Sequence, residues 1–396
     1  MITYELNNLY CKINPKHMCV STTLNKNIDI MISNSLYYFL TKTKKQIDNN
    51  IEQWDYYKKL TNPYEFIHTP PFYNSQLAVS NYNAISRSFY KLIEMTNNFN
   101  LLAPFRNKSI NTFHLAEGPG GFIEAMIHQR KNSSFFAHDK YHGITLQSKN
   151  RNIPKWQKLM NKFKNTKANI TIENGKSGDG DLLKEDNFIY CFDKYKNSMD
   201  FLTGDGGFDF SLNYEDQEIM SLKLIYAQIM YAIIMQKQGG CFILKIFDIF
   251  YKPSLELIYV LNCFYKSVRI CKPKTSRFAN SEKYIICQDF IFEDTNNYFP
   301  CFLQNLKDFR KKGVIKSVLS IDLPLCFIQN IEEISAILGK KQIQIIQSTI
   351  MLMQEKRNEK IDRLRKKNIE NSIKWCEQNN IPYQSSFKQK NIFTRI

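Results

Sequence analysis

The chain has 396 residues, 43% of them hydrophobic and 23% charged, a composition typical of folded rather than disordered proteins. Lysine and arginine number 54 against 37 aspartates and glutamates, which gives a formal net charge of +17. This excess favours nucleic acid or a nucleotide-bearing substrate as the partner. The alternative is a solvated basic surface that binds no partner. The ten cysteines are too sparse for a disulfide scaffold and include no C-x-x-C pair, so no metal site is expected.

The hydrophobic runs argue against secretion and against a membrane partner. Residues 1–8 contain no basic segment followed by an apolar core, so no secretory signal is expected. The longest apolar run, Leu224 to Met235, is shorter than the roughly 20 residues that span a membrane. We therefore expect a reducing, cytoplasmic setting.

Three regions follow one another along the chain. Residues 1–80 are predicted to form an extension of helices and loops. Residues 81–292 alternate short apolar runs with longer amphipathic runs, the pattern of an α/β domain. Its predicted strands are Thr112–Ala116, Gly143–Leu146, Asn169–Ile172, Met199–Gly204, Cys241–Ile246, Ser267–Cys271 and Tyr284–Gln288.

Two helical segments stand out. The first is predicted from about Glu215 to Gln238 and is expected to end at the glycine pair that follows, residues 239–240. The second lies in a basic helical extension, residues 293–396, where apolar positions from Ile343 to Leu364 predict an amphipathic helix. Residues 339–396 hold 13 lysines and arginines against 5 acidic residues. These cations either form a solvated face or bind RNA or a protein partner.

A glycine-rich turn follows the first predicted strand and begins a helix. It reads Glu117-Gly118-Pro119-Gly120-Gly121-Phe122. At the carboxyl edge of a parallel sheet, such a turn lets the backbone approach a ligand closely. It is neither a P-loop nor a dinucleotide fingerprint, since Ile123 occupies the last glycine position of G-x-G-x-x-G. An ordinary tight turn is the alternative interpretation.

Three more polar segments are predicted to reach the same edge of the sheet. Asp205 lies among glycines after one strand, and Lys245 interrupts an otherwise apolar strand. Buried lysines are rare without a partner, and burial or a second cation favours the neutral amine of a general base. Glu282 lies in the polar loop before the last strand. Together with the glycine turn, these residues predict an active site.

The segments resemble the FtsJ-like RNA ribose 2′-O-methyltransferases, in particular the branch that methylates the first transcribed nucleotides of capped messenger RNA. That family's Lys-Asp-Lys-Glu tetrad matches Lys91, Asp205, Lys245 and Glu282, in order and with similar flanks. The resemblance covers about residues 81–292. It implies a Rossmann-like methyltransferase fold of class α/β, with a seven-stranded, mostly parallel sheet whose last strand is antiparallel.

The resemblance also implies a cofactor, S-adenosylmethionine, and two groups of binding residues. Those implied for the cofactor are Glu117, Gly118, Pro119, Gly120, Gly121, Phe122, Asp181 and Asp205. Arg277, Asn280 and Ser281 are candidate contacts to the RNA substrate, the capped mRNA 5′ end. One departure is the Thr-Leu-Gln segment at 145–147, which lacks the acidic residue that many methyltransferases use to hold ribose hydroxyls.

The implied reaction moves a methyl group from a sulfonium sulfur to a ribose 2′ oxygen, whose proton a base must take. The hypothesis makes Lys245 the proton acceptor and Lys91 the neighbouring cation, with Asp205 and Glu282 orienting the two lysines. No metal is required. The alternatives are a ribosomal or transfer RNA 2′-O-methyltransferase, and a non-catalytic RNA-binding subunit of a capping complex.

Two further expectations concern context. The C-terminal helices are candidates for contact with a protein of the capping machinery. The sequences of the two glycine-rich segments resemble those in proteins of large cytoplasmic DNA viruses. A viral origin would place the protein in host cytoplasm or in the virion.

Overall fold

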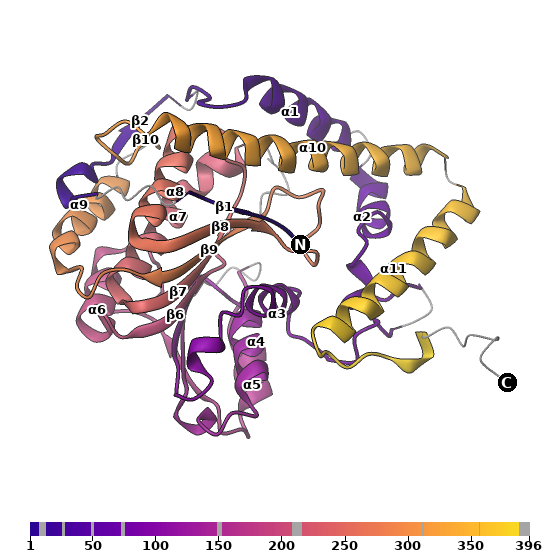
Figure 1. Cartoon of the computed structure of the whole chain (residues 1–396), viewed down its shortest axis with the longest axis horizontal. Helices are drawn as coiled ribbons and strands as arrows, with labels where there is room; N and C mark the ends of the chain where they lie inside the picture. The colour runs from indigo at the N-terminus through magenta and orange to yellow at the C-terminus, as the bar shows by residue number, and fades with distance from the viewer. Residues whose placement is uncertain are drawn as a thin grey trace.

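The computed structural model describes residues 1–7, 13–25, 28–48, 51–72, 76–148, 153–207, 216–310, 313–355 and 357–387. A central sheet has eight strands in the order β1-β8-β9-β7-β6-β3-β4-β5, with helices on both faces (Figure 1). The strands are β1 Ile2–Glu5, β3 Asn111–Leu115, β4 Lys140–Ile144, β5 Asn169–Glu173, β6 Met199–Gly204, β7 Gln236–Ile246, β8 Tyr265–Lys272 and β9 Lys283–Phe290. A separate two-stranded ladder pairs β2 (Ser21–Thr23) with β10 (Val314–Ser317).

The predicted fold class is confirmed. Strands β5, β4, β3, β6 and β7 pair in parallel, and β9 lies antiparallel between β7 and β8. This is the seven-stranded Rossmann-like sheet with an antiparallel last strand. An eighth strand, β1, pairs antiparallel with β8 and comes from the region predicted to contain only helices and loops.

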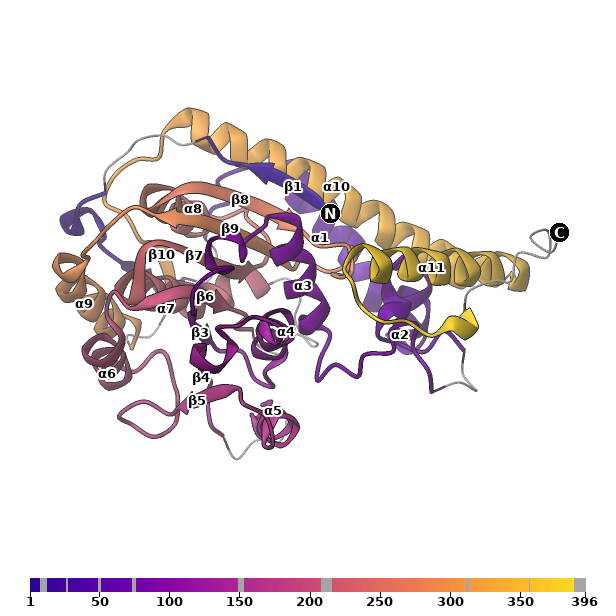
Figure 2. The ribbon, with the colours of Figure 1, turned by 60° about the horizontal axis from the view of Figure 1, so that its bottom comes forward.

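Two hydrophobic cores cover the two faces of the sheet. Neighbouring residues of β7 point to opposite faces, as the period of a strand requires. Phe242 packs into the core that includes α6, α7 and α8, whereas Ile243 packs with α3 and α4. The helices of the domain are α3 Ser88–Asn98, α4 Gly121–Arg130, α5 Gln157–Phe163, α6 Glu185–Tyr195, α7 Gln217–Met235 and α8 Lys252–Phe264 (Figure 2).

Helix α7 ends earlier than predicted. It stops at Met235, and β7 begins at Gln236, so the two glycines expected to end the helix lie inside the strand. A Cβ on Gly240 would lie 2.1 Å from Nε2 of Gln236, so the glycine permits close packing within the strand. The predicted start, Glu215, lies outside the described residues. Among the described helices, α7 alone is long and apolar enough to cross a membrane, and 83% of that stretch is buried inside the protein.

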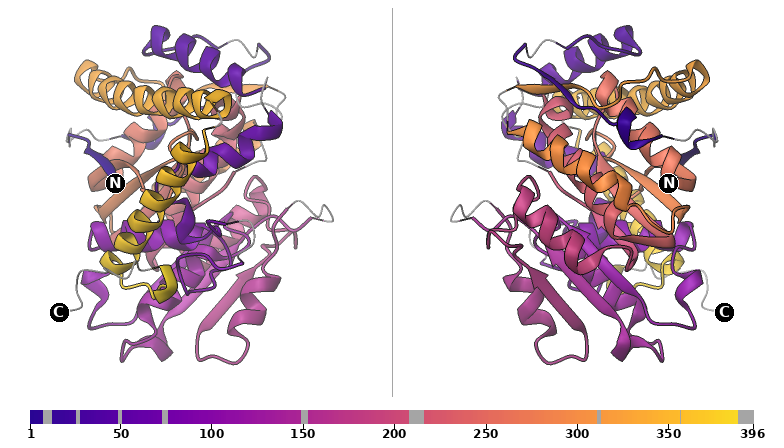
Figure 3. Two further views of the ribbon diagram at one scale, coloured as in Figure 1. Left: turned by 90° about the vertical axis from the view of Figure 1, so that its right-hand side faces the viewer. Right: turned by 90° about the vertical axis from the view of Figure 1, so that its left-hand side faces the viewer.

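The extensions pack against both faces of the sheet: residues 299–309 pack with α6 and α7, and residues 358–378 pack in the core that includes α3 and α4. They contain α1 (Asn34–Asp48), α2 (Ile51–Leu60), α9 (Phe299–Phe309), α10 (Leu325–Glu355) and α11 (Asn358–Gln378). Helix α1 lies along α10 (Figures 1 and 3). The single amphipathic helix predicted through Ile343 and Leu364 is instead two helices, because Arg357 is extended and α11 starts anew after it. The buried residues Ile346 and Ile350 confirm the predicted apolar face within α10.

Candidate active site

The glycine turn joins β3 to α4 at the carboxyl edge of the sheet, as predicted. Gly120 has φ +103°, a conformation that a side chain would strain. Glu117 is buried and its Oε1 accepts a hydrogen bond from the backbone N–H of Phe122 at 2.6 Å, inside the first turn of α4. Its Oε2 has no hydrogen-bond partner among the described residues. Burial raises the pKa of Glu117 well above its ordinary value, and the nearby Asp205 carboxylate raises it further.

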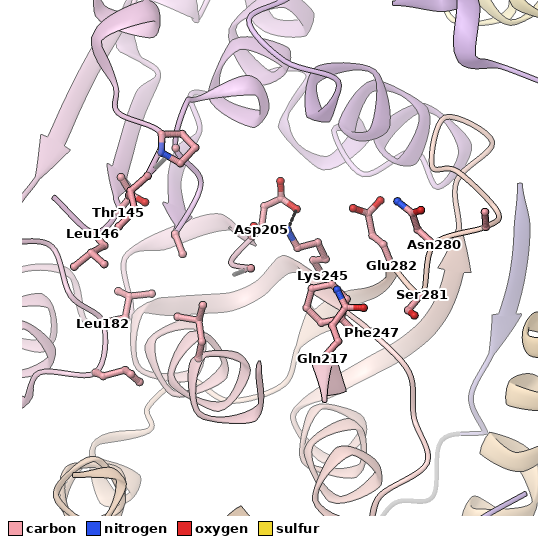
Figure 4. Close-up of a pocket in the computed structure, with 18 of the residues that line it drawn as sticks. Thr145, Leu146, Leu182, Asp205, Gln217, Lys245, Phe247, Asn280, Ser281 and Glu282 are labelled. Carbon is pink, nitrogen blue, oxygen red and sulfur yellow. Dashed lines mark hydrogen bonds and ion pairs between the residues drawn. The ribbon is translucent and has the colours of Figure 1, made fainter. Parts of the chain in front are cut away.

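Asp205 and Lys245 meet at the ends of the neighbouring strands β6 and β7. The Nζ of Lys245 lies 3.2 Å from Oδ1 of Asp205 and donates to the main-chain carbonyl of the same residue at 2.7 Å (Figure 4). Tyr284 of β9 donates its hydroxyl to Oδ1 of Asp205 at 3.1 Å. The parallel pairing of the two strands brings the aspartate and the lysine together, and the tyrosine fixes the carboxylate.

Lys91 and Glu282 form a second ion pair. The Nζ of Lys91, on α3, lies 2.7 Å from Oε1 and 2.9 Å from Oε2 of Glu282. Ser276 donates its hydroxyl to Oε1 at 2.8 Å. Burial alone would raise the pKa of Glu282, but the cations Lys91, Lys245 and Lys272 together hold it below its usual range. The glutamate is therefore an ionised carboxylate with lysines on either side.

A cavity of about 940 Å³ borders these residues. Its described lining includes Ala116, Gly118, Thr145, Leu146, Pro154, Gly180, Asp181, Leu182, Asp205, Lys245, Asn280, Ser281 and Glu282. Figure 4 shows three groups: Thr145, Leu146 and Leu182 lie on one side, Asp205 and Lys245 in the middle, and Asn280, Ser281 and Glu282 on the other. Half of the sequence-predicted site residues are thus in the described lining. The others, which the described lining does not include, are Lys91, Glu117, Pro119, Gly120, Gly121, Phe122 and Arg277.

Arg277 is a predicted RNA contact that the described cavity lining does not include. Its Nε and Nη2 donate to the two carboxylate oxygens of Glu65 at 2.9 and 2.6 Å. Arg87 donates Nη1 to the same carboxylate at 2.5 Å and Nη2 to the carbonyl of Thr275 at 3.1 Å. Fully buried Glu65, in the short 3₁₀ helix Glu65–Ile67, therefore ties the N-terminal extension to the loop that carries Glu282.

Sequence reasoning missed Glu65, and with it Glu94 of α3. The carboxylate of Glu94 is buried and accepts the backbone N–H groups of Lys274 and Thr275 at 2.8 and 3.0 Å. No local pattern identifies either glutamate, because the loop residues that they bind, Arg277 and Lys274, lie 212 and 180 residues further along the chain. Among the described residues, no group of three or more His, Cys, Asp or Glu side chains is placed to hold a metal ion.

The strand order, the glycine turn and the cavity at the carboxyl edge define an α/β protein of the Rossmann-like methyltransferase class. The model of the family described as FtsJ-like methyltransferase matches residues 84–290, just over half of the sequence. The chain belongs to this family.

The relatives it matches carry cap-specific names. The cap-specific mRNA (nucleoside-2′-O-)-methyltransferase 2 of Danio rerio is 25% identical over 355 residues, covering 84% of this chain and 45% of that protein. The cap-specific mRNA (nucleoside-2′-O-)-methyltransferase 1 of Homo sapiens is 34% identical over 198 residues, covering 48% of this chain and 22% of that protein. The chain therefore spans less than half the length of these curated relatives.

Among solved structures, human methyltransferase-like protein 13 in complex with SAH aligns with a TM-score of 0.31 and 10% identity. The alignment covers 57% of this chain and 92% of that one. The resemblance to sequences of large DNA viruses stays a prediction.

Proposed function

We propose that the chain transfers a methyl group from S-adenosylmethionine to the ribose 2′ hydroxyl of a nucleotide near the 5′ end of capped messenger RNA. One observation carries the proposal: Lys91, Asp205, Lys245 and Glu282, from four distant segments, form two lysine–carboxylate pairs beside the glycine turn. The cap-specific names of the relatives support the mRNA 5′ end as the substrate.

The glycine-turn side of the cavity fits S-adenosylmethionine. A Cβ at Gly118 would lie 2.4 Å from the carbonyl oxygen of Pro154, so glycine lets the turn pack closely against Pro154, which also lines the cavity. Leu146 and Leu182 supply apolar surface for the adenine ring, next to the carboxylate of Asp181. The unpartnered Oε2 of Glu117 leaves a polar atom beneath the turn. Bound here, S-adenosylmethionine supplies an electrophilic methyl group on a positively charged sulfur.

Lys245 is the proposed proton acceptor. A ribose hydroxyl is a very weak acid, so a base must take its proton while the oxygen attacks. The carbonyl and the carboxylate of Asp205 fix the Lys245 amine at the centre of the cavity, between the two sides described above. In its neutral form this amine takes the proton of the 2′ hydroxyl.

The other tetrad members are proposed to position the reacting groups. Glu282 is held as a carboxylate and pairs with Lys91, so this end of the site keeps a fixed charge pattern while RNA binds. Alignment of donor and acceptor contributes more than the base does, since good positioning supplies about 7–11 kcal/mol.

The test is methyl transfer from labelled S-adenosylmethionine to three matched short RNAs. The first carries an N7-methylguanosine cap, the second a bare 5′ triphosphate, and the third a cap and a 2′-O-methyl group on its first nucleotide. We expect transfer to capped RNA only; the third RNA then shows whether the first or a later nucleotide is the target. Equal transfer to capped and uncapped RNA would replace the proposal with a structural-RNA methyltransferase, and no transfer to any of them with a non-catalytic subunit.

A further inference from the structure

The cavity side opposite the glycine turn is built largely by the two extensions. It is lined by Lys44 and Ile47 of α1, Trp54 and Lys58 of α2, and Gln342 of α10. The Nε2 of Gln342 donates to the carbonyl of Ala279 at 3.0 Å, so this wall is continuous with the loop that carries Asn280 and Ser281. All five lining residues lie outside the segment 84–290 that the family model matches.

Lys44 occupies an inward-facing position of α1. Leu40 lies four residues before it and Ile47 three residues after it, and both are buried. Residues with this spacing share one face of a helix. The Lys44 side chain itself is only 12% exposed. Since lysine is rarely buried without a partner, an acidic partner is expected beside it.

The Lys44 amine belongs to a charged cluster at the cavity wall. Its Nζ lies 2.7 Å from Oδ2 of Asp248 and 3.1 Å from Oγ of Ser281, and Ser281 donates its hydroxyl to the same Oδ2 at 2.9 Å. The Nζ of Lys283 lies 2.9 Å from the other oxygen, Oδ1. Burial would raise the pKa of Asp248, but Lys283 and Lys44 hold it below its usual range. One carboxylate thus serves two ammonium groups, and this cluster carries a net positive charge.

The position of Lys44 is fixed before any ligand binds. Helix α1 packs closely on α10, where a Cβ added to Gly339 would lie 2.8 Å from Cδ2 of Leu36. A charge held in place by rigid elements binds a ligand with a smaller loss of conformational entropy than a mobile surface lysine.

We propose that Lys44 binds a backbone phosphate of the RNA acceptor, next to the ribose that approaches Lys245. The inference rests on the proposed function, because the donor on the glycine-turn side leaves the opposite side to the acceptor. An RNA chain carries a phosphate beside every ribose, and ammonium groups bind phosphates as point charges. A phosphate here balances the positive charge that Asp248 leaves uncompensated.

The test measures binding of a fluorescently labelled single-stranded RNA to the full chain by anisotropy, from about 50 to about 200 mM salt. The logarithm of the association constant for RNA falls linearly with the logarithm of the salt concentration. We expect Lys44→Met to make this slope shallower by about 0.7, which corresponds to the loss of one phosphate contact. Lys44→Gln, which keeps a hydrogen-bond donor for Asp248, should show the same loss, and Lys44→Arg should keep the slope of the unaltered protein. Lys45→Met is the matched control, since it removes the same charge from an exposed position of the same helix.

An unchanged slope in Lys44→Met and Lys44→Gln would overturn the inference, and so would an equal loss in Lys45→Met. Binding of S-adenosylhomocysteine by each variant shows that the protein is folded. Because the readout is RNA binding, it stays interpretable when methyl transfer fails. Cap-independent or absent transfer would therefore contradict the proposed function, whereas the salt slopes test Lys44 separately.

Discussion

The two sides of the cavity differ in origin. The glycine-turn side comes from the domain that the family model matches, whereas the opposite side takes Lys44, Trp54 and Gln342 from segments outside it. This division suits a family that shares one chemical step and differs in the molecules it modifies. Under the proposed function, the shared domain binds the methyl donor and the extensions help to bind the acceptor.

The two sides also differ in the forces that hold them. The glycine-turn side depends on close backbone packing, such as the approach of Gly118 to Pro154. The acceptor side depends on shared ion pairs, in which Asp248 serves two lysines and Glu65 serves two arginines. We therefore expect substitutions that add side-chain volume to weaken donor binding. Substitutions that remove a charge, or a change of pH, should instead weaken RNA binding.

The largest effect is expected at Lys245, which lies between the two sides. We expect Lys245→Met to slow methyl transfer about 10³-fold, since it removes the proposed proton acceptor. Binding of S-adenosylhomocysteine and of RNA should change little. Single-turnover transfer with saturating RNA measures the effect. Lys237→Met is the control, because Lys237 lies on the same strand with a side chain that is 60% exposed. If Lys245→Met retained most of the activity, Lys245 would not be the proton acceptor.

Glu65→Gln should lower the stability of the protein and weaken RNA binding on the acceptor side of the cavity. The change leaves Arg87 and Arg277 without their shared carboxylate, and breaking a buried ion pair costs about 3 kcal/mol. We expect that loss in the free energy of unfolding by urea, together with weaker RNA binding and unchanged S-adenosylhomocysteine binding. Equal weakening of RNA binding and S-adenosylhomocysteine binding would show that Glu65 does not act on the acceptor side alone.

The same glutamate predicts a dependence on pH. Burial would raise the pKa of Glu65, but Arg277 and Arg87 hold it below its usual range. The unfolded chain protonates this residue near its ordinary pKa of about 4.3. Its stabilising contribution is therefore complete above that pH and is lost as the pH falls toward the lowered value. Urea unfolding at a series of acidic pH values should show the difference between the protein and Glu65→Gln narrowing below about pH 4; a constant difference would contradict this.

A smaller effect is expected on the glycine-turn side. In Gly118→Ala the new methyl group meets the carbonyl oxygen of Pro154, so the backbone must shift. We expect donor binding to weaken about tenfold, or about 1.4 kcal/mol, as overpacking of this kind commonly costs. Calorimetric titration with S-adenosylhomocysteine measures it, and the salt dependence of RNA binding should not change. Unaltered donor binding would place the donor elsewhere.

Much of the domain could be predicted from the sequence because its signals are local. Apolar runs identify the buried strands, and β6 extends over the predicted residues, Met199–Gly204. The tetrad residues were found because each lies in a recognisable flank at a strand end or helix. Parallel pairing of β6 and β7 then brings Asp205 and Lys245 together. Lys91 comes from α3, and Glu282 precedes the antiparallel strand β9, so their ion pair depends on tertiary packing.

The features that the sequence did not predict depend on distant partners. Strand β1 has four residues and pairs with β8, more than 260 residues away in the chain, so no local pattern marks it. Helix α7 was expected to reach the glycine pair, but the pairing of Met199 with Gln236 begins a strand first. Lys44 and Glu65 resemble ordinary surface residues in the sequence. Only tertiary packing places Lys44 at the cavity and Glu65 against the loop that carries Glu282.

The most direct test of the proposed chemistry uses two capped RNAs that differ only in their first two nucleotides. One carries ribose at both positions, and the other carries 2′-deoxyribose. If Lys245 accepts the proton of a ribose 2′ hydroxyl, labelled methyl groups are transferred to the first RNA and not to the second. Equal transfer to both RNAs would place the methyl group on a base or elsewhere, and would contradict the role assigned to the four residues.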